Sequence, residues 1–343
     1  MNEEPHPMRR IPIPNEEFRS IPHLTFKRNG VNWIDYAGIS VSNICNLRCK
    51  YCLPNTTKVD PATRVVMSTS RFKEIVEAYT DFGYSYFTLT SGIGEFFMDK
   101  DWQAKLTYLE ENPKVRGWDF TSNFSIEIDM DFFFSLRKLR RMFVTIYGYT
   151  YKEYAAFNGA SPKQYETVVR QVKRLIDFPG SVKFKLKGGK AVRFQMAPIY
   201  LQELADARWD IIIDYQNDID THSGMISDEK CDSIKGFKQR EPNYPFGSVF
   251  NDTICYHLLT FKASEPGDIA ICFCTDPEMK HILGNIFEKP ISEILTYDNP
   301  LYLEYFKGPH DLCTACTTYE EFGLYNMGDY VFIPPDLEKY SKK

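Results

Sequence analysis

Short apolar and β-branched runs alternate with longer amphipathic stretches through the first two thirds of the chain. The runs fall at 37–41, 86–89, 118–120, 142–147, 182–186 and 209–213. Strands that alternate with helices in this way are typical of a parallel sheet built from βα units. Because six units are too few to close an eight-stranded barrel, the pattern predicts an α/β fold with a partial, TIM-like (β/α)6 barrel.

Two of the amphipathic stretches predict helices with clear boundaries. The first begins after Ser68 or Thr69 as the capping residue and ends near Gly83, and its apolar stripe contains residues 72, 75, 76 and 79. The second covers about 162–176, and its stripe repeats the same spacing at residues 165, 168, 169, 172 and 176.

Changes in composition divide the chain into five parts. Residues 1–36 are rich in Pro, Arg and Asn and read as an extension, and 37–223 form the barrel. Residues 224–251 are charged and then rich in Pro and Gly, as expected of a connector. A small α+β module with further cysteines follows at 252–320, and 321–343 form a C-terminal tail.

The 343 residues carry a net charge of -5 and nine cysteines. The acidic balance makes nucleic acid an improbable partner, since phosphate backbones are bound by basic surfaces. Apolar runs stay short of the roughly 20 residues that span a bilayer, so we expect a cytoplasmic protein without a membrane partner. In a reducing compartment, nine cysteines indicate metal or cluster ligands rather than disulfides.

The most informative motif is a C-x3-C-x2-C run formed by Cys45, Cys49 and Cys52, with Tyr51 before the last thiol. A four-iron, four-sulfur (4Fe-4S) cluster normally takes one thiolate for each iron, so three thiolates leave one iron open to another ligand. A zinc site is the alternative. It lacks a nearby fourth ligand, because after Cys52 the next His is His222 and the next Cys is Cys231.

This run resembles the signature of the radical S-adenosylmethionine (AdoMet) enzymes. The resemblance implies that the amino and carboxylate groups of AdoMet chelate the open iron. One electron from the cluster then breaks the sulfonium bond, and the resulting 5′-deoxyadenosyl radical abstracts hydrogen from the substrate. It also implies the partial barrel that the hydrophobic pattern predicts.

Three polar segments that follow predicted strands are candidates for binding AdoMet, since active residues of parallel barrels lie at the carboxyl ends of strands. The first, with Gly92, Gly94 and Glu95, resembles the Gly-Gly-Glu motif of the family, although Phe96 replaces the usual proline. Ser122 and Asn123 follow the third strand and suit the ribose. Thr145 ends the fourth. Taken singly, each segment could be an ordinary turn.

A second cysteine set has the spacing C-x11-G-x4-C followed later by C-x2-C, which resembles the SPASM auxiliary-cluster module in its shorter "twitch" form. The ligands would be Cys255, Cys272, Cys313 and Cys316, with Gly267 as the spacing glycine. Four thiolates would complete a second 4Fe-4S cluster that carries electrons. Cys274 could replace Cys272, because the two face the same side of a strand, and a zinc ribbon is the alternative.

The acid or base of the reaction is not identified by any motif. Tyr149 lies beside the expected cofactor rim, Asp214 ends the sixth strand, and His222 titrates near neutral pH. We keep these three as catalytic candidates.

The resemblance therefore implies a radical AdoMet oxidoreductase that acts on a small molecule of the aminocyclitol or sugar type, with the auxiliary cluster accepting the electron. A reductant such as flavodoxin or ferredoxin would be its partner. The first alternative is a radical maturase of a ribosomal peptide. The second is a zinc-binding protein without catalytic activity.

Overall fold

The computed structural model describes most of the barrel and parts of the C-terminal region. The described residues are 25–28, 31–50, 52, 64–89, 93–147, 150–175, 181–187, 211–216, 218–219, 238–239, 253–255, 260–272, 279, 281–296, 299–301, 304, 313, 316 and 321–323.

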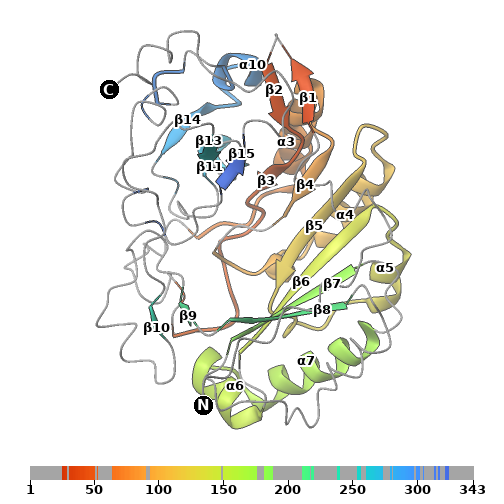
Figure 1. The fold of residues 1–343 in the computed structure, drawn as a ribbon. Coiled ribbons are helices and arrows are strands. Elements are labelled where there is room, and N and C mark those ends of the chain that lie inside the picture. The colour runs from red at the N-terminus through yellow and green to blue at the C-terminus, as the bar shows by residue number, and fades with distance from the viewer. Residues whose placement is uncertain are drawn as a thin grey trace.

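The central feature is a nine-stranded sheet in the order β14-β13-β12-β3-β4-β5-β6-β7-β8 (Figure 1). Six of its strands follow chain order and pair in parallel. They are β3 (Ala37–Ile39), β4 (Tyr86–Thr88), β5 (Gly117–Ser122), β6 (Leu139–Tyr147), β7 (Ser181–Lys187) and β8 (Ile211–Gln216). The predicted α/β fold with six parallel strands is confirmed, and the sheet remains open.

The C-terminal cysteine region is joined to this sheet. Strand β12 (Phe261–Ala263) pairs in parallel with β3, and β13 (Asp268–Ile271) and β14 (Ile282–Asn285) continue the sheet in antiparallel fashion. Gly267 turns the chain between β12 and β13 with φ of +91°, and a Cβ atom there would lie 2.3 Å from the Phe287 ring. The spacing glycine of the cysteine motif is therefore required by the turn and by close packing.

The two helices expected from the sequence are present. Helix α3 (Thr69–Phe82) is capped by the Ser68 side chain and ends at Gly83, and its buried residues include 72, 75, 76 and 79. Helix α7 (Pro162–Arg174) begins with a capping box formed by Ser161 and Gln164. Apolar periodicity and capping residues were sufficient to predict both.

Several short elements carry too little periodicity to be expected. They are η3 (Phe96–Met98), α4 (Trp102–Glu111), α5 (Met130–Ser135), α6 (Tyr151–Asn158) and α10 (Ile291–Ile294), together with the short strands β9 (Asp218–Ile219), β10 (Lys238–Gln239), β11 (Thr253–Cys255) and β15 (Glu321–Gly323).

Within the expected extension, β1 (Thr25–Arg28) and β2 (Val31–Ile34) form a hairpin. Its Phe26 and Trp33 pack edge-on against Phe82 of α3.

The two faces of the sheet have different chemistry. Trp118 and Phe120 of β5 face helices α4 and α5, where the Phe120 ring lies 5.5 Å from that of Phe133. On the other face, the buried Asp119 accepts hydrogen bonds from Tyr36 and Arg141, each at 3.0 Å. The helix-facing side is an aromatic core, and the opposite side carries buried polar groups. Within the described residues, none of the helices is both long and apolar enough to span a membrane.

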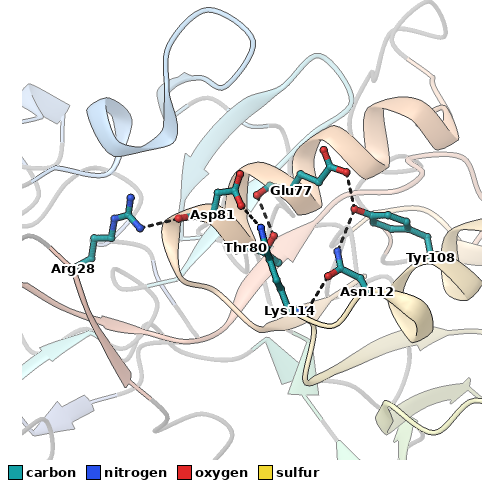
Figure 2. Close-up of polar contacts among 7 residues, drawn as sticks. All are labelled: Arg28, Glu77, Thr80, Asp81, Tyr108, Asn112 and Lys114. Carbon is teal, nitrogen blue, oxygen red and sulfur yellow. Dashed lines mark hydrogen bonds and ion pairs between the residues drawn. The ribbon is translucent and has the colours of Figure 1, made fainter.

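Polar side chains join the outer surfaces of α3 and α4 (Figure 2). Lys114 pairs with Asp81, whose backbone carbonyl accepts a 2.7 Å hydrogen bond from Arg28. Tyr108 of α4 donates to Glu77 of α3 at 3.1 Å. Because water competes for these groups, exposed pairs of this kind contribute little to stability.

A second ion pair lies inside the protein. The ammonium of Lys105 on α4 is 2.5 Å from the carboxylate of Asp99, which follows η3. The side chains are 0% and 3% exposed, respectively. Removing one partner of such a pair leaves the other charge buried without compensation.

We predict that Lys105→Met lowers the free energy of unfolding by about 3–5 kcal/mol, because Asp99 then remains buried and unpaired. Lys114→Met makes the same chemical change in the exposed pair with Asp81 and should cost less than about 1 kcal/mol. Urea unfolding of both variants measures the difference. Equal losses would mean that the buried pair is not a stabilising contact.

Candidate cluster and cofactor site

The cysteine loop follows β3 and is held by backbone hydrogen bonds to two other parts of the chain. The amides of Arg48 and Lys50 donate to the carbonyls of Asn158 and Phe157, at 2.8 and 3.0 Å. Both carbonyls lie in the last turn of α6, where helix carbonyls point beyond the helix and can accept hydrogen bonds from other segments. On the other side, the amide of Glu95 donates to the carbonyl of Ile44 at 2.7 Å.

The three thiols of the loop are partly exposed. The Cys45 sulfur accepts hydrogen bonds from the backbone N–H of Leu47 at 3.4 Å and from the side-chain amide of Asn123 at 3.6 Å. Burial, together with the negative charge of Glu95, raises the pKa of the Cys45 thiol to about 11. The Cys49 sulfur lies 3.1 Å from the side-chain oxygen of Asn158.

Within the described part of the chain, which includes all three thiols, no group of three His, Cys, Asp or Glu side chains is placed to hold a metal ion. Ligation of an iron-sulfur cluster by these cysteines, and the zinc alternative, both stay predictions.

Glu95 is a buried carboxylate beside the loop, with 2% exposure. It accepts hydrogen bonds from the Ser122 hydroxyl at 2.7 Å and from the backbone N–H groups of Asn123 at 2.8 Å and Phe97 at 3.3 Å. Burial raises its pKa to about 6, although these three hydrogen bonds act in the opposite direction. The three partners are neutral, and a carboxylate has about four acceptor sites, so one site remains for a further donor.

The predicted cofactor residues fall into two groups in the structure. Gly94, Glu95, Ser122 and Asn123 lie together beside the cysteine loop, but the hydroxyl of Ser122 is used by Glu95. Thr145 is partly exposed on β6, where it pairs in register with Lys185 of β7. Phe96, at the position where proline is usual, begins η3 and packs on Phe120, with the ring centroids 5.5 Å apart.

For five of the predicted residues, the structure gives either no placement or the backbone position alone. Gly92, Tyr149, His222 and Cys274 lie outside the described residues, so their roles stay predictions. Asp214 on β8 is placed by its backbone, in register with Lys185.

One described cysteine of the C-terminal set, Cys272, directly follows a strand of the main sheet. Cys272 follows β13, is buried, and has φ of +58°, a left-handed conformation that turns the chain there. Cys316 is also buried, and its amide donates to the carbonyl of Cys313 at 3.0 Å. Cys255 ends β11, which pairs with β15. Ligation by these four residues stays a prediction.

Sequence reasoning missed a set of polar residues that support the loop. Asn46 donates to Ser125 at 2.8 Å and accepts from Asn123 at 3.1 Å. Gln164 of α7 donates to the carbonyl of Asn46 at 3.3 Å. Asn158 is 1% exposed and contacts Cys49. No local sequence pattern marks these residues, because their partners lie far along the chain.

Gly94 generates a specific stability prediction. Its φ is +103°, and a Cβ atom there would lie 2.2 Å from the carbonyl oxygen of Ser42. Gly94→Ala should therefore lower the free energy of unfolding by about 1–3 kcal/mol or more. In Gly38→Ala the closest atom, the Phe261 carbonyl oxygen, is 3.3 Å from the added Cβ atom, and the change should stay within about 1 kcal/mol. Similar unfolding curves for the two variants would contradict the close approach at Gly94.

Comparisons with known proteins give partial sequence matches and a broader structural likeness. No family model matches the chain. The GTP 3',8-cyclase of Actinobacillus pleuropneumoniae serotype 3 (strain JL03) is 29% identical over 127 residues, which are 36% of each chain. The enzyme of the same name from Cronobacter sakazakii (strain ATCC BAA-894) is 30% identical over 89 residues, or 26% of each. The chain thus spans about a third or less of the length of these curated relatives.

Among solved structures, anSMEcpe with bound AdoMet aligns with a TM-score of 0.50 and 15% identity, covering 82% of this chain and 86% of that one. The same protein with AdoMet and the Cp18Cys peptide aligns with a TM-score of 0.50 and 14% identity, covering 82% and 85%. These alignments support the open barrel fold. The C-x3-C-x2-C loop and the partial sequence matches to the cyclases resemble the radical AdoMet enzymes, and the solved structures support the fold alone.

Proposed function

We propose that Cys45, Cys49 and Cys52 hold a 4Fe-4S cluster with one open iron for AdoMet, and that the chain is an oxidoreductase acting on a small molecule. The observation that carries the proposal is the placement of the three-thiol loop against the buried carboxylate of Glu95. When bound and reduced, the cluster supplies the electron that splits AdoMet so that a hydrogen atom can be removed from the substrate.

The residues around Glu95 suit an amino group. A carboxylate whose pKa is raised by burial gains most from a positively charged partner, which favours its ionised form. The ammonium of AdoMet would occupy the remaining acceptor site of Glu95. Asn123 would fix that orientation, because its backbone binds Glu95 and its side chain binds Cys45. Thr145 and the polar edge after β5 would face the nucleoside.

A second cluster on Cys255, Cys272, Cys313 and Cys316 would accept the electron that remains on the substrate after hydrogen removal. Loss of a proton to a base, for which Tyr149, Asp214 and His222 are the candidates, would complete a two-electron oxidation. A reduced flavodoxin or ferredoxin would supply the first electron. The net result of this scheme would be dehydrogenation of a small hydroxylated substrate, and maturation of a peptide is the alternative.

We predict that anaerobically reconstituted protein contains about eight irons per chain, as two four-iron clusters require. It should release 5′-deoxyadenosine when reduced with AdoMet. The Cys49→Ala variant should hold about four irons and should release no 5′-deoxyadenosine. Cys231→Ala removes a cysteine without an assigned ligand role and should match the unaltered chain. Stoichiometric zinc in place of iron would reject the proposal in favour of a zinc-binding protein.

The auxiliary cluster has its own test. In Cys316→Ala we expect about four irons, continued release of 5′-deoxyadenosine and loss of substrate oxidation, because the first cluster is intact and the electron acceptor is missing. Deuterium transfer from labelled metabolites into 5′-deoxyadenosine identifies the substrate for this assay. Full iron content in Cys316→Ala would remove Cys316 from the ligand set, and transfer only from peptides would favour a maturase.

A further inference from the structure

Helix α6 turns a single buried face toward the cysteine loop. Its buried residues are Tyr154 and Asn158, which lie four positions apart and therefore on the same side of the helix. The carbonyls at the end of the same helix bind the loop backbone at Arg48 and Lys50. The helix thus contacts both the backbone of the loop and the sulfur atom of Cys49.

Asn158 is in direct contact with one of these sulfur atoms. Its side-chain oxygen lies 3.1 Å from the Cys49 sulfur, so the thiol donates and the amide accepts. A thiolate that binds iron has no proton to donate. The oxygen and nitrogen of an amide exchange places by a 180° rotation, and in that orientation Asn158 donates an N–H group to the sulfur.

The hydroxyl group of Tyr154 makes no hydrogen bond of normal geometry among the described residues, although the side chain is 0% exposed. Burying a hydroxyl in this way costs free energy unless a ligand accepts a hydrogen bond from it. Ser125 interacts with the Tyr154 hydroxyl, but the Ser125 hydroxyl already donates to Asn123 at 2.6 Å and accepts from Asn46 at 2.8 Å.

The negative groups that act on the Tyr154 hydroxyl are those of the site. Burial raises the pKa of Tyr154 far above its usual range, and charges on Cys49, Glu95 and Cys45 add to the effect. The hydroxyl therefore stays protonated and remains a donor at any working pH. It lies within the electrostatic reach of two of the three predicted iron ligands.

We propose that Tyr154, with Asn158 beside it, donates a hydrogen bond to the sulfur atoms around the iron held by Cys49 and thereby raises the reduction potential of the cluster. The inference rests on the proposed cluster at Cys45, Cys49 and Cys52. Reduction adds negative charge to the cluster, and hydrogen bonds to its sulfur atoms stabilise the more negative state. Tyr154 is thus a positioning and tuning residue rather than a ligand.

The test is a redox titration of the reconstituted full chain, followed by electron paramagnetic resonance without AdoMet. The signal that later responds to AdoMet is assigned to the Cys45 loop. In Tyr154→Phe, the ratio of reduced to oxidised cluster at a given applied potential should fall on the order of tenfold. For a one-electron couple, that change lowers the midpoint potential by about 59 mV.

Tyr79→Phe is the matched control. Tyr79 on α3 is also fully buried and its hydroxyl also makes no hydrogen bond of normal geometry among the described residues, but it lies outside the cysteine site. Its midpoint potential should equal that of the unaltered chain. In the cluster-free protein, both substitutions should leave stability unchanged or increase it, because each removes a buried hydroxyl that makes no such hydrogen bond.

The outcomes distinguish the role of Tyr154 from the proposed cluster at the cysteine loop. An unaltered chain that binds no cluster removes the proposed function itself. A cluster that forms with the same potential in Tyr154→Phe as in Tyr79→Phe overturns the role of Tyr154 and leaves the proposed function intact. An unchanged potential with weaker AdoMet binding would assign the hydroxyl to AdoMet instead, and would also overturn the inference.

Discussion

The cysteine loop depends on other parts of the chain for its shape, because residues 40–50 form no helix or strand beyond the single bridge of Ser42 with Val66. Buried backbone groups need hydrogen-bond partners, and here the partners come from far along the sequence. The end of α6 binds the loop at Arg48 and Lys50, and the Glu95 turn binds it at Ile44. The thiols can be spaced for a cluster only if both contacts hold.

Glu95 connects this loop to the sheet at an electrostatic cost. One carboxylate accepts donors from the end of β5 and from η3, while its own amide binds the cysteine loop. The raised pKa indicates that burial outweighs those hydrogen bonds. A buried group that would be stabilised by a positive ligand is characteristic of a binding site rather than of a structural core. The buried Tyr154 hydroxyl, which makes no hydrogen bond of normal geometry among the described residues, fits the same description for a negatively charged ligand.

The local parts of the fold could be predicted from the sequence, and the long-range parts could not. Periodicity and caps were enough for α3 and α7, and apolar runs were enough for the six parallel strands. The pairing of β12 with β3 joins residues more than 200 positions apart, for which a single sequence gives no signal. The contact of Asn158 with Cys49 is of the same kind. Cysteine spacing indicated the chemistry, whereas the supporting polar residues depend on tertiary contacts.

The central claim is that the protein leaves one iron of the Cys45, Cys49 and Cys52 cluster open for AdoMet. Mössbauer spectroscopy of the iron-57-loaded protein, recorded before and after AdoMet is added, tests it directly. The account predicts that a single iron of one cluster changes its spectrum as its coordination number increases, while the other irons stay the same. Spectra that do not change on addition of AdoMet would contradict it.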